Sequence, residues 1–363
     1  MDVSGVVQTK FEPVREAFAA VLAAQQGAGA AVAVWFDGRW VVDLWGGRQA
    51  GAGSRGWQPD SLVQVYSVTK PFAVAGALLL VERGLLHLDA AMQRYWPQFQ
   101  APATVAQVLS HQAGVVVLDA PAPTELFYDW HRLCALLAGQ APVWKPGTRH
   151  GESLLFYGHL VGELVRRVDG RTLGRFLRDE ICGPLGLDFA VGLGPCQQVR
   201  VVDLIGLDEQ FRLRSSAGRP ELYRRAVANP PGAQDPAIVN SAPWRAAEVP
   251  AINGHGSARG VAGLYAGLLQ GRIVSLTLLR EVTRVHCAGP DAVLGEHTAW
   301  GLGFGIDADW FGMGGLGGSI GGACPTGGGY AFGFVTASMG DHQRATQIEN
   351  ALRSCLGLPP LPD

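Results

Sequence analysis

A serine and a lysine three residues apart, Ser67 and Lys70, stand at the start of an apolar segment running from Pro71 to Leu80. The segment predicts a helix, and on a helix positions i and i+3 lie on one face, within reach of one another. A serine hydroxyl is a weak nucleophile until a neighbouring group takes its proton. A lysine can do so when burial lowers its pKa. The pair therefore predicts a serine nucleophile with a lysine partner.

The lysine usage of the chain supports this interpretation. Of 29 Lys and Arg residues, only Lys10, Lys70 and Lys145 are lysines, and only Lys70 has a serine three residues before it. An arginine could not accept a proton at this position, because it stays charged in proteins. The alternative is an ordinary surface helix turn, which is what most Ser-x-x-Lys patterns are.

Composition indicates a globular protein with one large core or two coupled ones. The chain has 363 residues, of which 48% are hydrophobic and 17% charged. Its net charge of -2 predicts no nucleic-acid partner and no anionic membrane surface. Residues 1–11 lack the pattern of a signal peptide, and no apolar run reaches transmembrane length. We therefore expect a cytoplasmic protein with reduced thiols.

No metal or cofactor is expected. The six cysteines include no Cys-x-x-Cys pair, and the histidines do not pair at metal-ligand spacing with each other or with acidic residues.

Strand patterns lie near both ends of the chain, and helical patterns lie between them. Asp37-Gly38 separates two short strands, 30–36 and 39–45, and is a strong hairpin signal. Further strands are expected at 301–307 and 330–338, around a glycine-rich segment, 312–329. Helices are expected at 11–24, 67–84, 104–109, 155–168, 172–181, 257–269 and 343–355, and 200–250 reads as a long irregular segment.

This order predicts an α+β fold, with one antiparallel sheet built from both termini, flanked by helices, and a helical insertion. We expect residues 1–90 and 257–363 to form the sheet domain and 91–256 the helical insertion domain. The active site would lie at their junction.

Seven segments are similar to the serine β-lactamase-like superfamily, in particular to class C β-lactamases, family VIII carboxylesterases and related transacylases. They follow that family's order: YSVTKP at 66–71, VLSHQAG at 108–114, PGT at 146–148, GELVRR at 162–167, GPLGL at 183–187, NGHGSARG at 253–260 and GLGGS at 315–319. The resemblance implies the β-lactamase/transpeptidase-like fold. It also implies an acyl-enzyme on Ser67, formed from a small ester or amide, with water, an amine or an alcohol as acceptor.

The chain departs from the family where a tyrosine usually shuttles protons beside the serine and lysine. The nearest corresponding position holds Glu152, and a tyrosine, Tyr157, follows five residues later. Either residue could serve as the base, Tyr157 as a phenolate near Lys70 or Glu152 as a buried carboxylate. The alternatives are an aromatic side chain packed in the core for Tyr157 and a solvated or capping carboxylate for Glu152.

A second departure lies in the strand that lines the family's site. Met313 stands where the family usually has Lys, His or Trp, and a methionine offers no strong donor. The backbone amides of Ser67 and Leu316 would then hold the oxyanion. We expect the substrate pocket to include Met313, Gly314, Gly315, His255 and Trp310, although core packing is the default for the tryptophan and a structural role is equally open for the histidine.

Two rival motifs lie in the glycine-rich segment. Residues 317–321 fit the Gly-x-Ser-x-Gly nucleophile elbow, which Asp341-His342 could complete only in an unusual order, and 312–317 fit a dinucleotide fingerprint. Both motifs need a following helix, and none is expected there. We therefore predict a Ser67 esterase or ATP-independent transacylase of small-molecule metabolism. The alternative is a non-catalytic acyl-binding or sensor protein, and surface Trp and Leu side chains could support a homo-oligomer.

Overall fold

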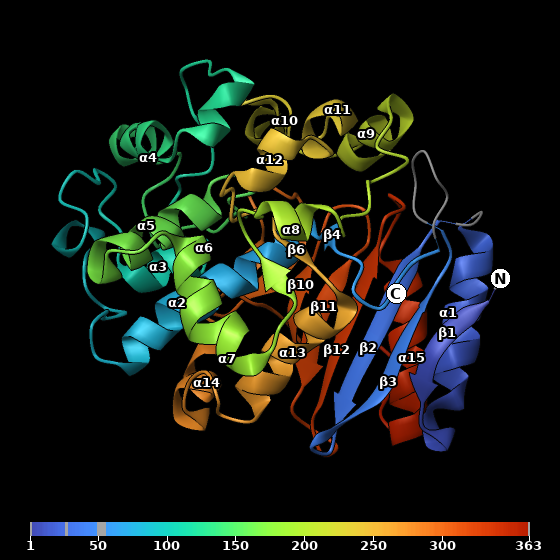
Figure 1. Ribbon diagram of the computed structural model, residues 1–363. Helices are drawn as coiled ribbons and strands as arrows, with labels where there is room; N and C mark the ends of the chain where they lie inside the picture. Colours follow the sequence, from blue (N-terminus) through green and yellow to red (C-terminus); the bar gives the residue numbers. More distant parts are fainter. Residues whose placement is uncertain (1, 26–27, 49–55, 362–363) are drawn as a thin grey trace.

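The computed structural model describes residues 2–25, 28–48 and 56–361. Within them, nine strands form one antiparallel sheet in the order β1-β3-β2-β12-β11-β10-β9-β8-β7, so strands from both ends of the chain meet in its middle (Figure 1). The strands are β1 Val3–Val7, β2 Ala30–Phe36, β3 Arg39–Gly46, β7 Cys287–Pro290, β8 His297–Trp300, β9 Gly305–Asp307, β10 Trp310–Gly314, β11 Ile320–Cys324 and β12 Tyr330–Thr336. The predicted α+β fold class is confirmed.

The first hairpin forms at the predicted turn. Asp37 and Gly38 both have positive φ values, 48° and 79°, as a two-residue type I′ connection requires. Beyond the turn, β2 pairs with β12 over its whole length, from Ala30 opposite Thr336 to Phe36 opposite Tyr330. This pairing joins the two ends of the chain into one sheet.

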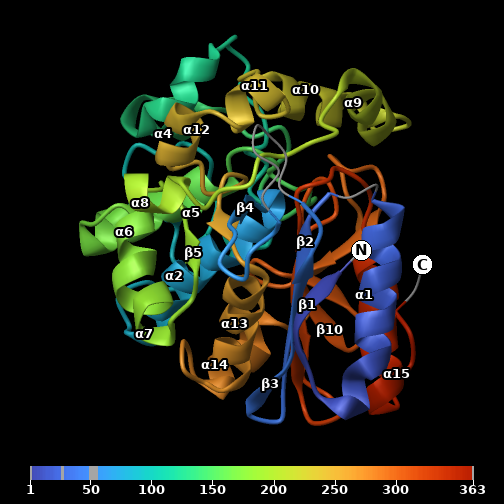
Figure 2. The ribbon, with the colours of Figure 1, turned by 45° about the vertical axis from the view of Figure 1, so that its right-hand side comes forward.

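Helices cover both faces of the sheet. On one face, α1 (Glu12–Ala24) and α15 (Gln343–Leu356) pack side by side, while α13 (Ala258–Leu269) lies on the other (Figure 2). In α1 the buried Val14, Phe18 and Val21 recur at helical spacing. They form a core between helix and sheet that is separate from the larger core on the α13 side.

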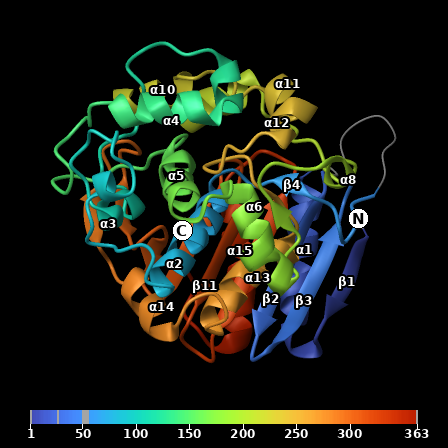
Figure 3. The same ribbon diagram turned by 60° about the vertical axis from the view of Figure 1, so that its left-hand side comes forward.

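The middle of the chain forms a helical region beside the α13 face, as Figure 3 shows. A small sheet, β4 (Val63–Gln64), β6 (His255–Gly256) and β5 (Phe189–Ala190), lies next to it. The remaining helical elements are η1 Thr9–Phe11, η2 Tyr66–Thr69, α2 Lys70–Glu82, η3 Met92–Arg94, α3 Val105–Leu109, η4 Thr124–Tyr128, α4 Trp130–Gly139, α5 Tyr157–Asp169, α6 Leu173–Leu177, η5 Arg178–Cys182, α7 Gly183–Leu185, α8 Pro195–Gln198, α9 Glu209–Ser216, α10 Glu221–Ala228, α11 Pro236–Val239, α12 Ala242–Ala246 and α14 Leu276–Val282.

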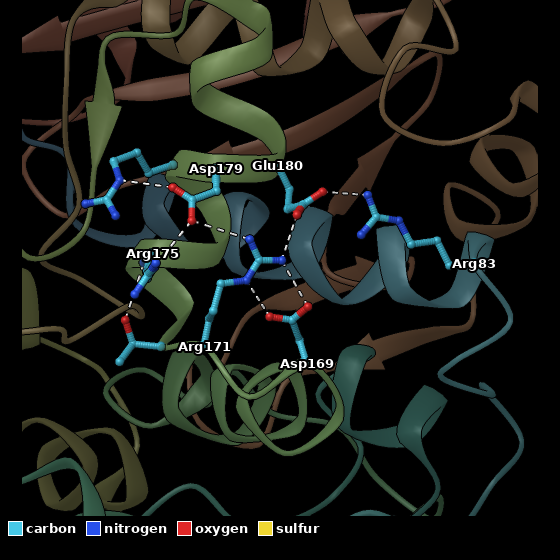
Figure 4. Close-up of polar contacts among 8 residues, drawn as sticks. Arg83, Asp169, Arg171, Arg175, Asp179 and Glu180 are labelled. Atoms are coloured by element: carbon cyan, nitrogen blue, oxygen red, sulfur yellow. Dashed lines mark hydrogen bonds and ion pairs between the residues drawn. The ribbon is translucent and has the colours of Figure 1, made fainter.

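Helix α2 connects the two regions, because it packs on α5 and α6 and also contacts β10. Its far end is tied to the helical region by a surface ion-pair network (Figure 4). Arg171 binds Asp169 at 2.6 Å and Glu180 at 2.7 Å, and Glu180 also binds Arg83 at the end of α2, at 2.6 Å. Single surface pairs contribute little to stability, so the value of this network lies in holding several elements together. The predicted division into 1–90 with 257–363 and 91–256 stays a prediction.

One local prediction was wrong, because the segment 200–250 is not irregular throughout and contains α9 to α12. The glycine-rich segment, in which a strand lining the site was expected, contains the end of β10 and all of β11, although glycine disfavours strands. A Cβ atom at Gly321 would lie 2.5 Å from Val261 and 2.8 Å from Tyr265, both on α13. β11 therefore lacks a side chain at a point where α13 lies directly on the sheet.

No helix within the described ranges is both long enough and apolar enough to cross a bilayer.

Candidate active site

Ser67 lies in the short helical turn η2, between β4 and α2. Tyr66, directly before it, has a φ of 46°, which is uncommon for a residue with a side chain and marks local strain. Two contacts hold the turn in place: the Tyr66 hydroxyl donates to the carbonyl of Ala233 at 3.2 Å, and Thr69 Oγ1 accepts from the amide of Gly254 at 2.9 Å. The surrounding structure thus fixes the backbone that presents the Ser67 hydroxyl.

The structure brings Ser67, Lys70 and Glu152 together. Lys70 Nζ lies 2.7 Å from Ser67 Oγ and 2.9 Å from Glu152 Oε1, and Ser67 Oγ lies 3.4 Å from the same carboxylate oxygen. Lys70 Nζ also donates to the carbonyl oxygen of Ala251 at 3.3 Å. An ammonium group has three N–H donors, and these three acceptors match them.

Two opposing effects act on the pKa of Lys70. The side chain is fully buried, and burial lowers its pKa, while the charge and hydrogen bond of Glu152 act in the opposite direction. In the observed arrangement Lys70 donates to Ser67 at 2.7 Å, and the Ser67 hydroxyl donates to Glu152 at 3.4 Å. Lys70 and the Glu152 carboxylate thus both lie within hydrogen-bonding reach of the serine hydroxyl.

Glu152 belongs to a segment without regular secondary structure that precedes α5. The amides on either side of it donate to His111: Gly151 to its carbonyl at 3.1 Å and Ser153 to Nδ1 at 3.3 Å. Burial and the charge of Lys70 hold the pKa of His111 well below its usual value, so the neutral ring accepts this bond. The amide of Glu152 itself donates to the carboxylate of Asp291, at 3.1 and 3.3 Å to the two oxygens.

The hydroxyl of Tyr157, the other candidate for the base, makes its hydrogen bond away from Ser67. It opens α5, is fully buried, and donates its hydroxyl proton to the carbonyl of Leu109 at 2.7 Å. Its ring stacks on His111 with centroids 4.3 Å apart. Burial, with a smaller contribution from the Glu152 charge, raises the pKa of this phenol well above its ordinary value. Its geometry fits the packing alternative rather than a phenolate base.

The turn between β10 and β11 lies against the nucleophile's backbone. A Cβ atom at Gly315 would overlap the carbonyl oxygen of Val65 and lie 3.4 Å from the amide nitrogen of Ser67. The Gly315 amide donates to the carbonyl of Ser319 at 2.7 Å, and its carbonyl faces His342 Nε2 at 3.0 Å. Leu316 therefore begins a fixed turn beside Ser67, where its amide was predicted to hold an oxyanion.

A cavity of about 1100 Å³ opens above Ser67 and Glu152. Four predicted pocket residues line it: Met313, Gly314, Gly315 and Trp310. Its remaining lining is largely apolar, with charged groups that include the ion pair of Arg219 with Glu296 at 2.8 Å.

His255, the fifth predicted pocket residue, is not brought to the cavity. It is fully buried on β6, paired with Gln64 and Ala190 of the small sheet, and burial lowers its pKa to about 3. The histidine is therefore a neutral core residue in the structural role that was left open for it.

The rival nucleophile does not assemble. Ser319 is buried, and its Oγ accepts from the backbone amide of Thr336 at 3.2 Å, whereas His342 faces the carbonyl of Gly315. Residues 312–317 form the end of β10 and a hairpin turn, with no helix after them. Among the described residues, no three His, Cys, Asp or Glu side chains cluster as a metal site would require.

Sequence reasoning missed His111 and Asp291, the two residues that hold the Glu152 segment. His111 lies in the 108–114 segment that is similar to the family, but no local pattern connects it with Glu152. Asp291 follows Gly289 and Pro290 in a hairpin connection, and neither spacing nor periodicity marks it.

The chain is similar to known proteins over nearly its whole length. The family model described as Beta-lactamase matches residues 14–354. The chain is 31% identical over 352 residues to the Esterase/beta-lactamase LipL of Mycobacterium tuberculosis (strain ATCC 25618 / H37Rv), covering 88% of this chain and 79% of LipL. The crystal structure of a family VIII carboxylesterase superposes with a TM-score of 0.89 at 34% identity, covering 98% of this chain and all of the other. A penicillin-binding protein homologue from Caulobacter crescentus gives 0.85 at 32%, with the same coverage.

Proposed function

This chain belongs to the beta-lactamase family, and from that premise we propose that it is a serine hydrolase or acyltransferase that forms an acyl-enzyme on Ser67. The observation that carries the proposal is the placement of Glu152 Oε1 and Lys70 Nζ around Ser67 Oγ, at 3.4 and 2.7 Å. This gives the nucleophile both a proton acceptor and a fixed positive charge. The substrate class we propose is a small ester or activated acyl compound.

In acylation, Ser67 Oγ attacks the carbonyl carbon of the ester while its proton passes to Glu152. The negative charge that develops on the carbonyl oxygen is held by the amides of Ser67 and Leu316. Lys70 stays protonated, and its positive charge stabilises the Ser67 oxygen and the Glu152 carboxylate on either side of it. When the tetrahedral intermediate collapses, the carbon–oxygen bond to the alcohol breaks and Glu152 returns the proton to that leaving group.

In deacylation, the acceptor attacks the acyl carbon from the cavity. Its proton passes to Glu152, and the bond to Ser67 Oγ then breaks as the serine takes the proton back. Water as acceptor makes the protein an esterase, and an amine or alcohol makes it a transacylase. Met313, buried in the cavity wall without a strong donor, favours an apolar acceptor or acyl group over ordered water.

The test is turnover of a p-nitrophenyl acyl ester followed by mass spectrometry of the acid-quenched protein. We expect p-nitrophenol release and an acyl adduct on Ser67, both lost in Ser67→Ala. Added amines or alcohols that speed turnover and appear acylated indicate a transacylase, and turnover by water alone indicates an esterase. If no ester leaves an adduct, the non-catalytic acyl-binding alternative takes first place.

A matched pair of variants separates the two candidate bases. Glu152→Gln should lower kcat by about 100- to 10,000-fold, the usual contribution of a general base. Tyr157→Phe removes only a hydroxyl that donates to Leu109, so its kcat should fall less than about tenfold. The reverse order of effects would transfer the base role to Tyr157.

The paired charges also argue against the non-catalytic alternative. Lys70 is fully buried and Glu152 is 6% exposed. A buried ion pair is weak evidence for stability, because desolvation offsets much of its Coulombic attraction. A role in chemistry at Ser67, which lines the large cavity, explains better why this buried ion pair lies in contact with the serine.

A further inference from the structure

We propose that Asp291 is a positioning residue that holds Glu152 in place to take the Ser67 proton, an inference that rests on the proposed function. Asp291 lies in the connection between β7 and β8 and is 2% exposed. It is not among the residues that line the cavity. Its effect on the reaction must therefore pass through the groups that it binds.

The Asp291 carboxylate collects hydrogen bonds from two separate segments. Besides the amide of Glu152, it accepts from the amides of Val293 and Leu294, both at 2.8 Å, and from Thr298 Oγ1 at 3.4 Å. None of the ion pairs among the described residues involves this carboxylate. A buried carboxylate without a cation is costly unless it is well hydrogen-bonded, and these donors supply the bonds.

The bonds matter because the segment around Glu152 has no helix or sheet to hold it. Its alternate amides point in opposite directions, as in extended backbone: Gly151 and Ser153 donate to His111, and Glu152 donates to Asp291. A further bond, from the amide of Ala292 to the carbonyl of His150 at 3.0 Å, joins the same two segments. Asp291 thus holds the backbone amide of Glu152, the proposed base.

The same carboxylate couples the base to the cavity wall. Leu294 and Thr298 donate to it and also line the cavity. The distance between Glu152 Oε1 and Ser67 Oγ, 3.4 Å in the structure, therefore depends on the connection between β7 and β8. A displacement of about 1 Å at a reacting group can cost on the order of 100-fold in rate.

Asp291→Asn tests the proposal. It keeps the shape but turns one acceptor oxygen into an NH₂ group, which cannot accept from the amides that converge there. We expect kcat with a p-nitrophenyl ester to fall about 10- to 100-fold, with a smaller change in KM. Asp129→Asn is the matched control, because Asp129 also accepts from a backbone amide, that of Arg132 at 3.0 Å, but caps α4 outside the cavity lining. It should leave kcat unchanged.

A double-mutant cycle on kcat distinguishes a residue that acts through Glu152 from one that has only a structural role. If Asp291 acts through Glu152, then Asp291→Asn should change kcat less than about twofold in the Glu152→Gln background, although it lowers kcat in the wild type. An equal loss in both backgrounds, or a wild-type rate for Asp291→Asn, overturns the positioning role. A wild-type rate for Glu152→Gln takes the base role from Glu152 and overturns this inference as well. Failure of the proposed function itself shows instead as the absence of an acyl adduct on Ser67 in the wild-type protein, so the two failures are distinguishable.

A second variant covers the case in which Asp291→Asn does not fold. Thr298→Val removes one donor to the carboxylate and leaves the carboxylate intact. It should lower kcat in the same direction by a smaller factor, and this loss should also vanish in the Glu152→Gln background. A loss that persists in that background contradicts the inference.

Discussion

Gly315→Ala should disable the oxyanion site without touching any group that transfers a proton. The added Cβ would overlap the Val65 carbonyl oxygen and lie 3.4 Å from the Ser67 amide nitrogen. Because carbon atoms pack at about 3.5–4.0 Å, the turn has to retreat by on the order of 1 Å. Overpacking of this kind costs about 1–3 kcal/mol in unfolding free energy. Moving the amides of Ser67 and Leu316 apart should lower kcat/KM about 100-fold or more.

The measurement is kcat/KM with a p-nitrophenyl ester, together with thermal melting. Gly139→Ala is the control, because a Cβ at this last residue of α4 meets no atom within 4 Å. It should keep the wild-type rate and leave stability equal or slightly higher, since alanine favours helix over glycine by about 0.5–1 kcal/mol. A Gly315→Ala protein with wild-type kcat/KM and melting temperature would refute the placement of the oxyanion site.

Three further changes test the buried groups. Lys70→Arg keeps a positive charge, but the larger, planar guanidinium cannot take the place of the fully buried ammonium and its three short contacts, so kcat should fall at least about 100-fold. A wild-type kcat would contradict any special role for the lysine. Met313→His introduces a donor into the cavity wall and should raise hydrolysis relative to amine acylation in a partition assay, and an unchanged ratio would remove Met313 from the choice of acceptor. The pKa of His255, about 3 in the folded protein and 6.5 as its ordinary value, means that only the unfolded chain binds this proton between those pH values. The contribution of His255 to the free energy of unfolding should therefore be fully present above pH 6.5 and be lost as the pH falls toward 3. In His255→Asn, the slope of the urea-derived unfolding free energy against pH should be smaller by up to about 1.4 kcal/mol per pH unit. An equal slope in both proteins counts against this cause.

Local signals in the sequence were enough for several parts of the fold. The Asp37-Gly38 hairpin forms as expected because its two positive φ values need residues that tolerate them. The α1 helix follows its apolar spacing and ends within a residue or two of the predicted bounds. The proximity of Ser67 and Lys70 was also predictable, since two positions three apart on a helical turn must face the same side.

Other parts depended on contacts between distant segments. The strands β10 and β11 are rich in glycine, and they form because each pairs with neighbouring strands of the large sheet, while α13 packs directly on Gly321 of β11. His255 stands in a segment that is similar to the family's site, yet pairing within the small sheet turns its ring into the core. Neither outcome is encoded in a local pattern.

The choice between Glu152 and Tyr157 separates these two kinds of information most clearly. The sequence by itself determined the fold class, the Ser67–Lys70 pair and the presence of two candidates for a third group. Only the tertiary structure decided which candidate faces the serine. An irregular segment has no periodicity from which orientation can be read, and here its direction is set by His111 and Asp291, 41 residues before and 139 residues after Glu152 in the chain. Hydrogen bonds between segments so far apart form only when the whole chain is folded.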